Sequence, residues 1–237
     1  MAEPPVPRGE LLLLLDFDGT LVPIAPTPDA IRVPDAVPGL LERLRARGHQ
    51  VWVITGRPAA WVSERLPGTS VVGLHGLQWP DRPDPPRSPA LDRAAEEGEA
   101  LARRFPGLLV EDKGLSLALH TRQVDPARHA EAAAAARLLA ERTAAEDPDL
   151  GVLTGHEVVE IRRRDATKAA AVRELSRASG RRVVYVGDDV TDEEAFAALP
   201  EGAVSVRVGP PDVPTLAEWR LPDVPAVLAW LERLASA

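Results

Sequence analysis

Residues 11–20 are LLLLLDFDGT, and this stretch decides the fold that we expect. Five consecutive leucines are typical of a short strand buried on both faces of a parallel sheet. The strand should end at Asp16 and Asp18, whose side chains are two residues apart and therefore point to the same side. Carboxylates at the carboxyl end of such a strand lie where open α/β sheets bind their ligands. The stretch therefore predicts an active site at this edge of the sheet.

The composition is that of a globular protein with one large domain or two small ones. Of the 237 residues, 45% are hydrophobic and 27% charged, so the chain can bury a core. The sequence contains no cysteine, which excludes disulfides and thiolate metal sites. It begins without a signal pattern, and the leucine run is too short to span a bilayer, so we expect a cytoplasmic protein with no membrane partner. The net charge of −8 argues against nucleic acid as a partner.

Strands and helices alternate at both ends of the chain. The expected strands are 11–15, 50–55, 70–76, 182–189 and 203–209, and the expected helices are 34–48, 58–66, 165–180, 191–199 and 225–237. We take Asp165 as a candidate cap for the helix that follows it. Alternation at these lengths predicts βαβ units, hence an α/β fold with a Rossmann-like parallel sheet.

The middle of the chain has a different order of elements. The segment 80–89 contains five prolines and is expected to be a linker. The pattern after it is helix–strand–strand–helix–strand–strand. The helices are expected at 89–104 and 126–146, and the strands near 108–112, 115–122, 151–156 and 158–163. We therefore expect an α+β cap domain at 83–163, inserted into a core formed by 1–82 and 164–237.

Polar side chains follow three of the expected core strands. Asp16 and Asp18 follow the first strand, Thr55 ends the second, and Asp188 lies in GDD at 187–189. Two carboxylates about 5 Å apart repel by roughly 3 kcal/mol at an effective dielectric constant of about 20. A hard divalent cation relieves this repulsion, and Mg²⁺ is the usual one where phosphate is also bound. The sequence therefore predicts Mg²⁺ held by Asp16, Asp18 and Asp188.

The same residues fit the transfer of a phosphoryl group. Asp16 is the expected nucleophile that attacks phosphorus. Asp18 is the expected acid and base, which protonates the leaving alcohol and later accepts a proton from water. Thr55 is expected to donate its hydroxyl to a phosphoryl oxygen. Lys168 is one of only two lysines, the other being Lys113, and is expected just inside a helix N-terminus, where its charge adds to the helix dipole.

Four motifs, in this order, resemble the haloacid dehalogenase-like hydrolase superfamily. They are DFDGT at 16–20, Thr55, Lys168 and GDD at 187–189. More narrowly, the chain resembles the trehalose-6-phosphate phosphatases. That resemblance rests on TGRP at 55–58, GLHG at 73–76, EDKGLSLALHTR at 111–122, VVEIRRRDATK at 158–168 and GDDVTDEEAF at 187–196.

The resemblance implies an activity and a further set of residues. The activity is Mg²⁺-dependent hydrolysis of trehalose 6-phosphate to trehalose and phosphate through an aspartyl-phosphate intermediate, with the inserted domain specifying the substrate. Glu111, Lys113 and Glu160 of the cap would hold sugar hydroxyls, which charged groups bind more strongly than neutral ones. The other substrate-binding residues that the resemblance implies are Gly19, Thr20, Gly56, Arg57, His75, Asp189 and Asp192, and His120 also matches the family.

Alternatives remain open at this level. The catalytic residues do not separate trehalose 6-phosphate from sucrose 6-phosphate or mannosyl-3-phosphoglycerate, although the EDK and EIR segments of the cap favour trehalose. A phosphosugar mutase would use the same aspartyl phosphate. A catalytically silent regulatory subunit is disfavoured, because no member of the acidic set is missing. The oligomeric state is not set by the sequence, and a monomer is our default expectation.

Overall fold

The computed structural model has two compact units. It describes residues 3–25, 27, 30–155 and 157–236. The core unit consists of Met1–Pro83 and Thr167–Ala237, and the cap unit of Asp84–Ala166. These divisions lie one and three residues from the boundaries expected from the sequence. Among the described helices, none combines the length and the apolar character that crossing a bilayer requires.

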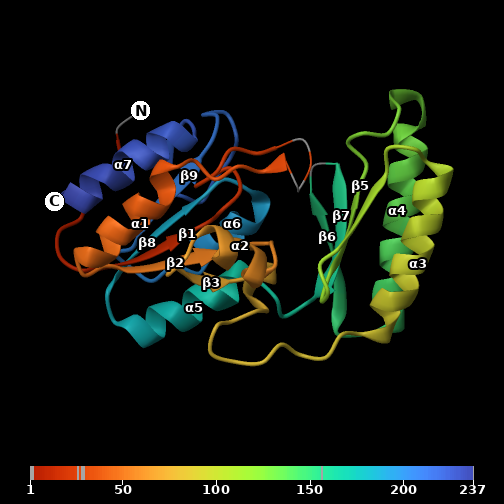
Figure 1. The fold of residues 1–237 in the computed structure, drawn as a ribbon, viewed down its shortest axis with the longest axis horizontal. Helices are drawn as coiled ribbons and strands as arrows, with labels where there is room; N and C mark the ends of the chain where they lie inside the picture. The colour runs from red at the N-terminus through yellow and green to blue at the C-terminus, as the bar shows by residue number, and fades with distance from the viewer. Residues whose placement is uncertain (1–2, 26, 28–29, 156, 237) are drawn as a thin grey trace. The chain divides into compact units, whose positions relative to one another are not determined.

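The core unit contains a parallel sheet of six strands in the order β10-β9-β8-β1-β2-β3 (Figure 1). The strands are β1 (Leu11–Leu15), β2 (Gln50–Ile54), β3 (Ser70–Val72), β8 (Arg182–Gly187), β9 (Val204–Val208) and β10 (Trp219–Leu221). The expected α/β class with a parallel core sheet is confirmed. The short edge strand β10 was not predicted, because three residues are too few to show a period.

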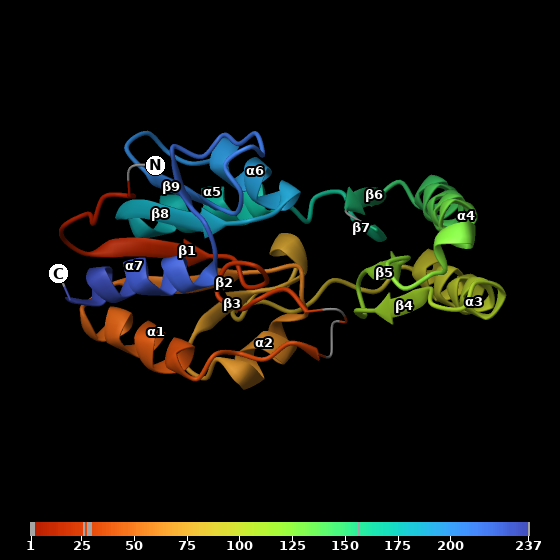
Figure 2. The ribbon, with the colours of Figure 1, turned by 90° about the horizontal axis from the view of Figure 1, so that it is seen from above.

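Helices cover both faces of this sheet (Figure 2). They are α1 (Ala36–Ala46), α2 (Ala59–Arg65), α5 (Lys168–Ser179), α6 (Val190–Ala197) and α7 (Val224–Ser236). Leu11, Leu13 and Leu15 pack with α1 and α7, whereas Leu12 and Leu14 pack with α5 and α6. Strand β1 is therefore buried on both faces, as the leucine run predicts, and each buried leucine stabilises the fold by about 1.5–3 kcal/mol.

Strand β1 lies at the point where the order of the strands reverses. The chain adds β2 and β3 on one side of β1, and β8, β9 and β10 on the other. Leu15 pairs with Val53 of β2 and with Val186 of β8. Since all three strands are parallel, their carboxyl ends meet at one edge of the sheet. Ligands of open α/β sheets bind outside such a reversal.

Two local predictions in the core unit were wrong. The strand expected at 70–76 ends at Val72, and Leu74–Gly76 forms a 3₁₀ turn, η2, because the Gly73 N–H donates to Gln78 O at 2.9 Å and folds the chain back. Helix α5 is capped by Thr167 rather than by Asp165. The Thr167 hydroxyl accepts from the N–H of Ala170 at 3.1 Å, which satisfies a donor of the first turn.

The cap unit is an antiparallel sheet of four strands with two helices. The sheet order is β4-β5-β7-β6. The elements are α3 (Pro89–Arg104), β4 (Leu109–Asp112), β5 (Leu117–His120), α4 (Pro126–Glu146), β6 (Leu150–Gly155) and β7 (Val158–Arg163). Leu117, Leu119 and Ile161 pack with the apolar side chains of α3 and α4. Because side chains alternate along a strand, Ala118 and Glu160 belong to the opposite face.

Candidate active site

The carboxyl ends of β1 and β8 bring three carboxylates together. Asp16 follows β1, and its N–H donates to Val186 O at 2.9 Å. Asp188 follows β8, and Asp192 lies in the first turn of α6. Asp16, Asp188 and Asp192 each offer an oxygen, and these oxygens lie within 4.8 Å of one another. Oxygen donors at this spacing fit a hard divalent cation.

Lys168 lies within this cluster and is buried. Its Nζ donates to Asp16 Oδ1 at 2.5 Å and to Asp192 Oδ1 at 2.8 Å. Burial by itself would lower the pKa of Lys168, but the charges of Asp16 and Asp192 raise it above its ordinary value. The lysine is therefore charged at neutral pH. As the first residue of α5, it also lies at the positive end of that helix, as expected.

Without a cation, the negative charges of Asp16 and Asp188 are unfavourable in this buried site. Burial raises the pKa of Asp16 well above its usual range, Lys168 opposes this, and Asp192 and Asp188 add to it. Burial raises the pKa of Asp188 to about 7, and the charge of Asp192 contributes. A divalent cation would offset both effects, because it stabilises the ionised forms. The donor set therefore fits a metal ion.

Asp192 has a different environment from the other two carboxylates. Its Oδ1 accepts from Lys168 Nζ and, at 2.7 Å, from the hydroxyl of Tyr185. Its Oδ2 accepts from the N–H groups of Asp188 and Asp189, both at 2.9 Å. Two carboxylate oxygens offer about four lone pairs, and these four bonds use them. The fully buried Asp192 thus holds the GDD loop, whereas Asp189, the exposed N-cap of α6, faces solvent.

Asp18 is not one of the three clustered carboxylates. Arg57 binds it with two hydrogen bonds, from Nε to Oδ2 at 2.6 Å and from Nη2 to Oδ1 at 2.8 Å. The nearby Thr55 is buried, and its Oγ1 accepts from the backbone N–H of Arg57 at 3.1 Å. The carboxylate of Asp18 therefore pairs with Arg57 and does not join the cluster that Asp16 and Asp188 form with Asp192.

Gly19 and Thr20 both contact Asp188. Gly19 has φ +75°, and a Cβ atom at this position would lie 2.1 Å from Asp188 Oδ2. Thr20 is completely buried, and its hydroxyl donates to Asp188 Oδ1 at 3.4 Å. The turn after β1 therefore leaves room for the Asp188 carboxylate only where residue 19 has no side chain.

Gly56 and His75 belong to two loops that pack together. A Cβ atom at Gly56 would lie 2.6 Å from His75 Nε2. The N–H of His75 donates to Thr55 O at 2.8 Å, and the N–H of Leu74 donates to Arg57 O at 3.0 Å. Leu74 and His75 have φ values of 47° and 59°, a backbone conformation that is uncommon for residues other than glycine. The buried His75 therefore packs against the 55–57 loop and supports its conformation.

The three predicted cap residues lie on strands or turns that adjoin one another. The register pairs Ala118 of β5 with Glu111 of β4 on one side and with Glu160 of β7 on the other. Lys113 follows β4, and its N–H donates to Ser116 O at 3.0 Å. Glu111 and Glu160 thus belong to one row across the sheet, with a small alanine between them.

Hydrogen bonds connect these cap residues. Glu160 accepts from the Ser116 hydroxyl at 2.6 Å and from Lys113 Nζ at 3.2 Å. Glu111 and His120 are joined through His120 Nε2 at 2.9 Å. Sequence reasoning did not identify Ser116, because its bond to Glu160 joins residues that are 44 positions apart.

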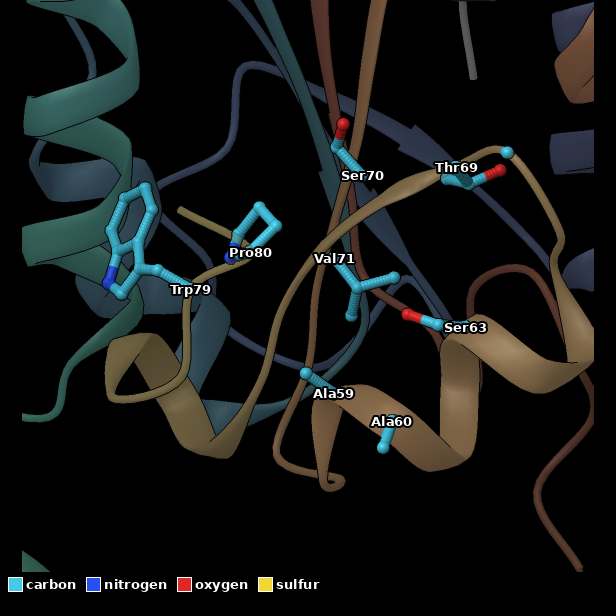
Figure 3. Close-up of a pocket in the computed structure, with 9 residues that line it drawn as sticks. Ala59, Ala60, Ser63, Thr69, Ser70, Val71, Trp79 and Pro80 are labelled. Atoms are coloured by element: carbon cyan, nitrogen blue, oxygen red, sulfur yellow. The ribbon is translucent and has the colours of Figure 1, made fainter. Parts of the chain in front are cut away.

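The pocket in Figure 3 is a separate feature of the core unit. It has a volume of about 250 Å³. Its lining residues are Ala59, Ala60, Ser63, Gly68, Thr69, Ser70, Val71, Trp79 and Pro80. Ser70 begins β3, whereas the acidic cluster lies beyond the carboxyl ends of β1 and β8. None of the residues predicted for the site lines this pocket.

Comparison with known proteins establishes the family. The family model described as trehalose-phosphatase matches residues 14–225, which include the acidic cluster and the whole cap unit. The chain belongs to the trehalose-phosphatase family. It is therefore a phosphatase, and the expected enzyme class is confirmed.

Individual relatives cover nearly the whole chain. A probable trehalose-phosphate phosphatase of Sinorhizobium fredii is 33% identical over 94% of this chain and 87% of its own length. The trehalose-6-phosphate phosphatase of Escherichia coli is 32% identical over 100% of this chain and 91% of its own. The solved C-terminal domain of the C. albicans trehalose-6-phosphate phosphatase covers 96% of this chain and 92% of that domain, with a TM-score of 0.84 and 24% identity. At that identity the likeness shows the fold alone.

Proposed function

We propose that the chain hydrolyses trehalose 6-phosphate to trehalose and inorganic phosphate, the step that completes trehalose biosynthesis. The observation that carries this proposal is the family match over 14–225, because it spans the catalytic cluster and the cap together. The two relatives described above are named for this activity. The polar row on the cap sheet supports a hydroxyl-rich substrate.

Asp16 is the nucleophile of the proposed reaction. Its carboxylate oxygen forms a bond to phosphorus while the bond between phosphorus and the sugar oxygen breaks, which gives an aspartyl phosphate. Lys168, 2.5 Å from Asp16 Oδ1, favours the ionised carboxylate. Its charge also stabilises the additional negative charge on the phosphoryl oxygens in the transition state.

Asp18 is the acid and base. It gives a proton to the departing sugar oxygen, and then takes a proton from the water that attacks the aspartyl phosphate. Thr55 binds a phosphoryl oxygen: since its Oγ1 already accepts from the Arg57 N–H, its own hydroxyl hydrogen can be donated to the substrate.

Asp16 and Asp188 are the side chains that would hold Mg²⁺. Both have a pKa raised by burial, and their oxygens lie close together. When bound, the ion supplies positive charge against the carboxylates and the phosphoryl oxygens. The Asp18 side chain is bound to Arg57, so we assign its carboxyl group to proton transfer. Asp192 has its lone pairs occupied, and we assign it to holding the loop and Lys168 instead of to substrate.

The cap unit selects the substrate. Glu111, Lys113 and Glu160 carry the charged donors and acceptors that bind sugar hydroxyls, and charge-assisted bonds of this kind are stronger than neutral ones. Ser116 and Lys113 hold the two oxygens of Glu160 in place. The cytoplasmic location and the monomeric state stay predictions from the sequence.

One assay tests this function directly. Phosphate release would be measured for trehalose 6-phosphate, sucrose 6-phosphate, mannosyl-3-phosphoglycerate and glucose 6-phosphate, with Mg²⁺ and with a chelator. We expect kcat/KM for trehalose 6-phosphate to exceed the others by at least about 100-fold, and turnover to stop without the ion. A higher kcat/KM for another sugar phosphate would show that this compound, and not trehalose 6-phosphate, is the substrate. Isomerisation that requires a bisphosphate primer, with little free phosphate, would identify a mutase.

A further inference from the structure

Arg57 contacts the indole ring of Trp61 as well as the carboxylate of Asp18. Its guanidinium carbon lies 4.4 Å from the centroid of the Trp61 ring. The same guanidinium makes the two hydrogen bonds to Asp18, at 2.6 and 2.8 Å. One planar group is therefore fixed by an aromatic face and by a two-pronged carboxylate contact, which leaves it little freedom to rotate.

The Trp61 ring is itself held in place. Phe17 is completely buried next to Asp18 in the chain, and its ring meets the Trp61 ring edge to face, with centroids 6.0 Å apart and an interplanar angle of 87°. The guanidinium carbon of Arg65 lies 3.5 Å from the ring centroid. Trp61 is thus fixed by helix α2 (Figure 1), which carries it, and by the residue that precedes Asp18.

The exposure of the ion pair makes this support necessary. The side chain of Asp18 is 34% exposed and that of Arg57 is 13% exposed. An ion pair with a partly exposed partner gains little free energy, because holding long side chains in one geometry costs entropy. An aromatic face against the guanidinium removes part of that freedom before the pair forms.

We propose that Trp61 is a positioning residue for the phosphatase reaction, which acts through Arg57 to orient the carboxylate of Asp18. The inference rests on the proposed role of Asp18 as the acid. Under this proposal Arg57, which the family resemblance assigned to substrate binding, orients Asp18. A misplaced acid slows the step in which the leaving oxygen must gain a proton, and slows it most for alcohols that leave poorly.

Aryl phosphates isolate this step. The ratio kcat/KM reports the reaction up to the first irreversible step, here the formation of the aspartyl phosphate, and phenolate needs a proton more than p-nitrophenolate does. Trp61→Leu should lower kcat/KM about 10-fold for phenyl phosphate and less than about 3-fold for p-nitrophenyl phosphate. Trp61→Phe, which keeps an aromatic face, should restore most of the loss. Equal losses on the two esters would overturn the proposal.

Two further variants complete the test. In the Arg57→Met background, Trp61→Leu should cause no further loss, because the two residues act in series; losses that multiply would contradict the proposal. Arg82→Met is the control, since it removes a guanidinium that lies over an indole ring, that of Trp79, at the same 4.4 Å, and leaves the Asp18–Arg57–Trp61 contacts in place. This variant should leave kcat/KM unchanged for both phenyl phosphate and p-nitrophenyl phosphate. Because both substrates are artificial, the outcome is independent of whether trehalose 6-phosphate is the substrate.

Discussion

Gly19 and Asp188 are so close that a single methyl group would force them apart. A Cβ atom at Gly19 would lie 2.1 Å from Asp188 Oδ2, well inside any contact distance. The carboxylate belongs to the loop after β8 and the glycine to the turn after β1. Adjacent parallel strands thus create both the acidic cluster and the requirement for glycine.

The first prediction concerns Gly19→Ala. The methyl group should displace Asp188, so that Mg²⁺ affinity and kcat/KM each fall by at least about 100-fold. Titration with Mg²⁺ and phosphate release would measure both. Gly202→Ala is the control, because Gly202 also has a positive φ, +78°, with no atom within 4 Å of the added Cβ. That variant should lose about 1 kcal/mol of stability and keep full activity. Normal Mg²⁺ affinity in Gly19→Ala would contradict the assignment of Asp188.

The second prediction concerns the nucleophile. Asp16→Asn keeps an oxygen that can accept from Lys168 Nζ, which lies 2.5 Å from Asp16 Oδ1 in the native protein. The folded structure should persist, while turnover should fall by at least about 10⁴-fold because the amide does not attack phosphorus. Circular dichroism and phosphate release give the two readouts. Turnover near that of the native protein would remove Asp16 from the nucleophile's role.

The third prediction separates the cap from the chemistry. Ser116→Ala removes a hydrogen bond to Glu160 Oε1, and Lys113→Ala removes one to Glu160 Oε2. Each should lower kcat/KM for trehalose 6-phosphate by about 10- to 100-fold and leave p-nitrophenyl phosphate within about 2-fold. Arg137→Ala, which breaks an exposed ion pair with Glu141 on α4, is the control and should affect neither substrate. Parallel losses on both substrates would argue against a sugar site in the cap.

The fourth prediction concerns pH and metal. Burial raises the pKa of Asp188 to about 7 in the metal-free protein, so this carboxyl carries a proton below that pH and must release it to bind a cation. Affinity for Mg²⁺ should therefore fall as the pH drops from about 8 to about 6, with proton release on binding. Calorimetry in buffers of different ionisation enthalpy measures both effects. Equal affinities at the two pH values would show that Asp188 is not a ligand.

The linked effect on stability has a definite sign. A raised pKa means that the folded, metal-free protein binds the proton of Asp188 more tightly than the unfolded chain does. Its stability therefore decreases as the pH rises from near 4 through about 7. The gain in unfolding temperature on addition of Mg²⁺ should then be larger at about pH 8 than at about pH 6.

Local patterns predicted some elements to the residue. Helices α3 and α4 begin and end where expected, at Pro89–Arg104 and Pro126–Glu146. In each, a proline opens the first turn, and the residue before it caps the helix: Ser88 accepts from the Ala90 N–H, and Asp125 from the Ala127 N–H. Helix-capping patterns that lie within a few residues can therefore be recognised from the sequence alone.

Contacts between distant segments were not readable in this way. Asp192 was predicted to bind substrate, and the structure adds that it is fully buried and binds Lys168, Tyr185 and the backbone of the GDD loop. Asp18 was expected to share a metal ion with Asp16 and Asp188, and nothing in the sequence indicated that its carboxylate pairs with Arg57. A motif shows which chemical groups are available, but not which of them a fold places in contact.

The amino-acid sequence by itself determined the parallel core sheet, the inserted cap and the acidic residues at the ends of β1 and β8, because burial and strand direction follow from the order of hydrophobic and polar residues. Only the tertiary structure shows the different surroundings of the carboxylates, on which the roles that we propose for them rest. Oxygens of Asp16 and Asp188 lie close together, Asp192 accepts four hydrogen bonds, and the Asp18 carboxylate is paired with Arg57. These surroundings depend on which hydrogen-bond donors lie within about 3 Å of each carboxylate. Most of those donors belong to segments that are distant in the sequence.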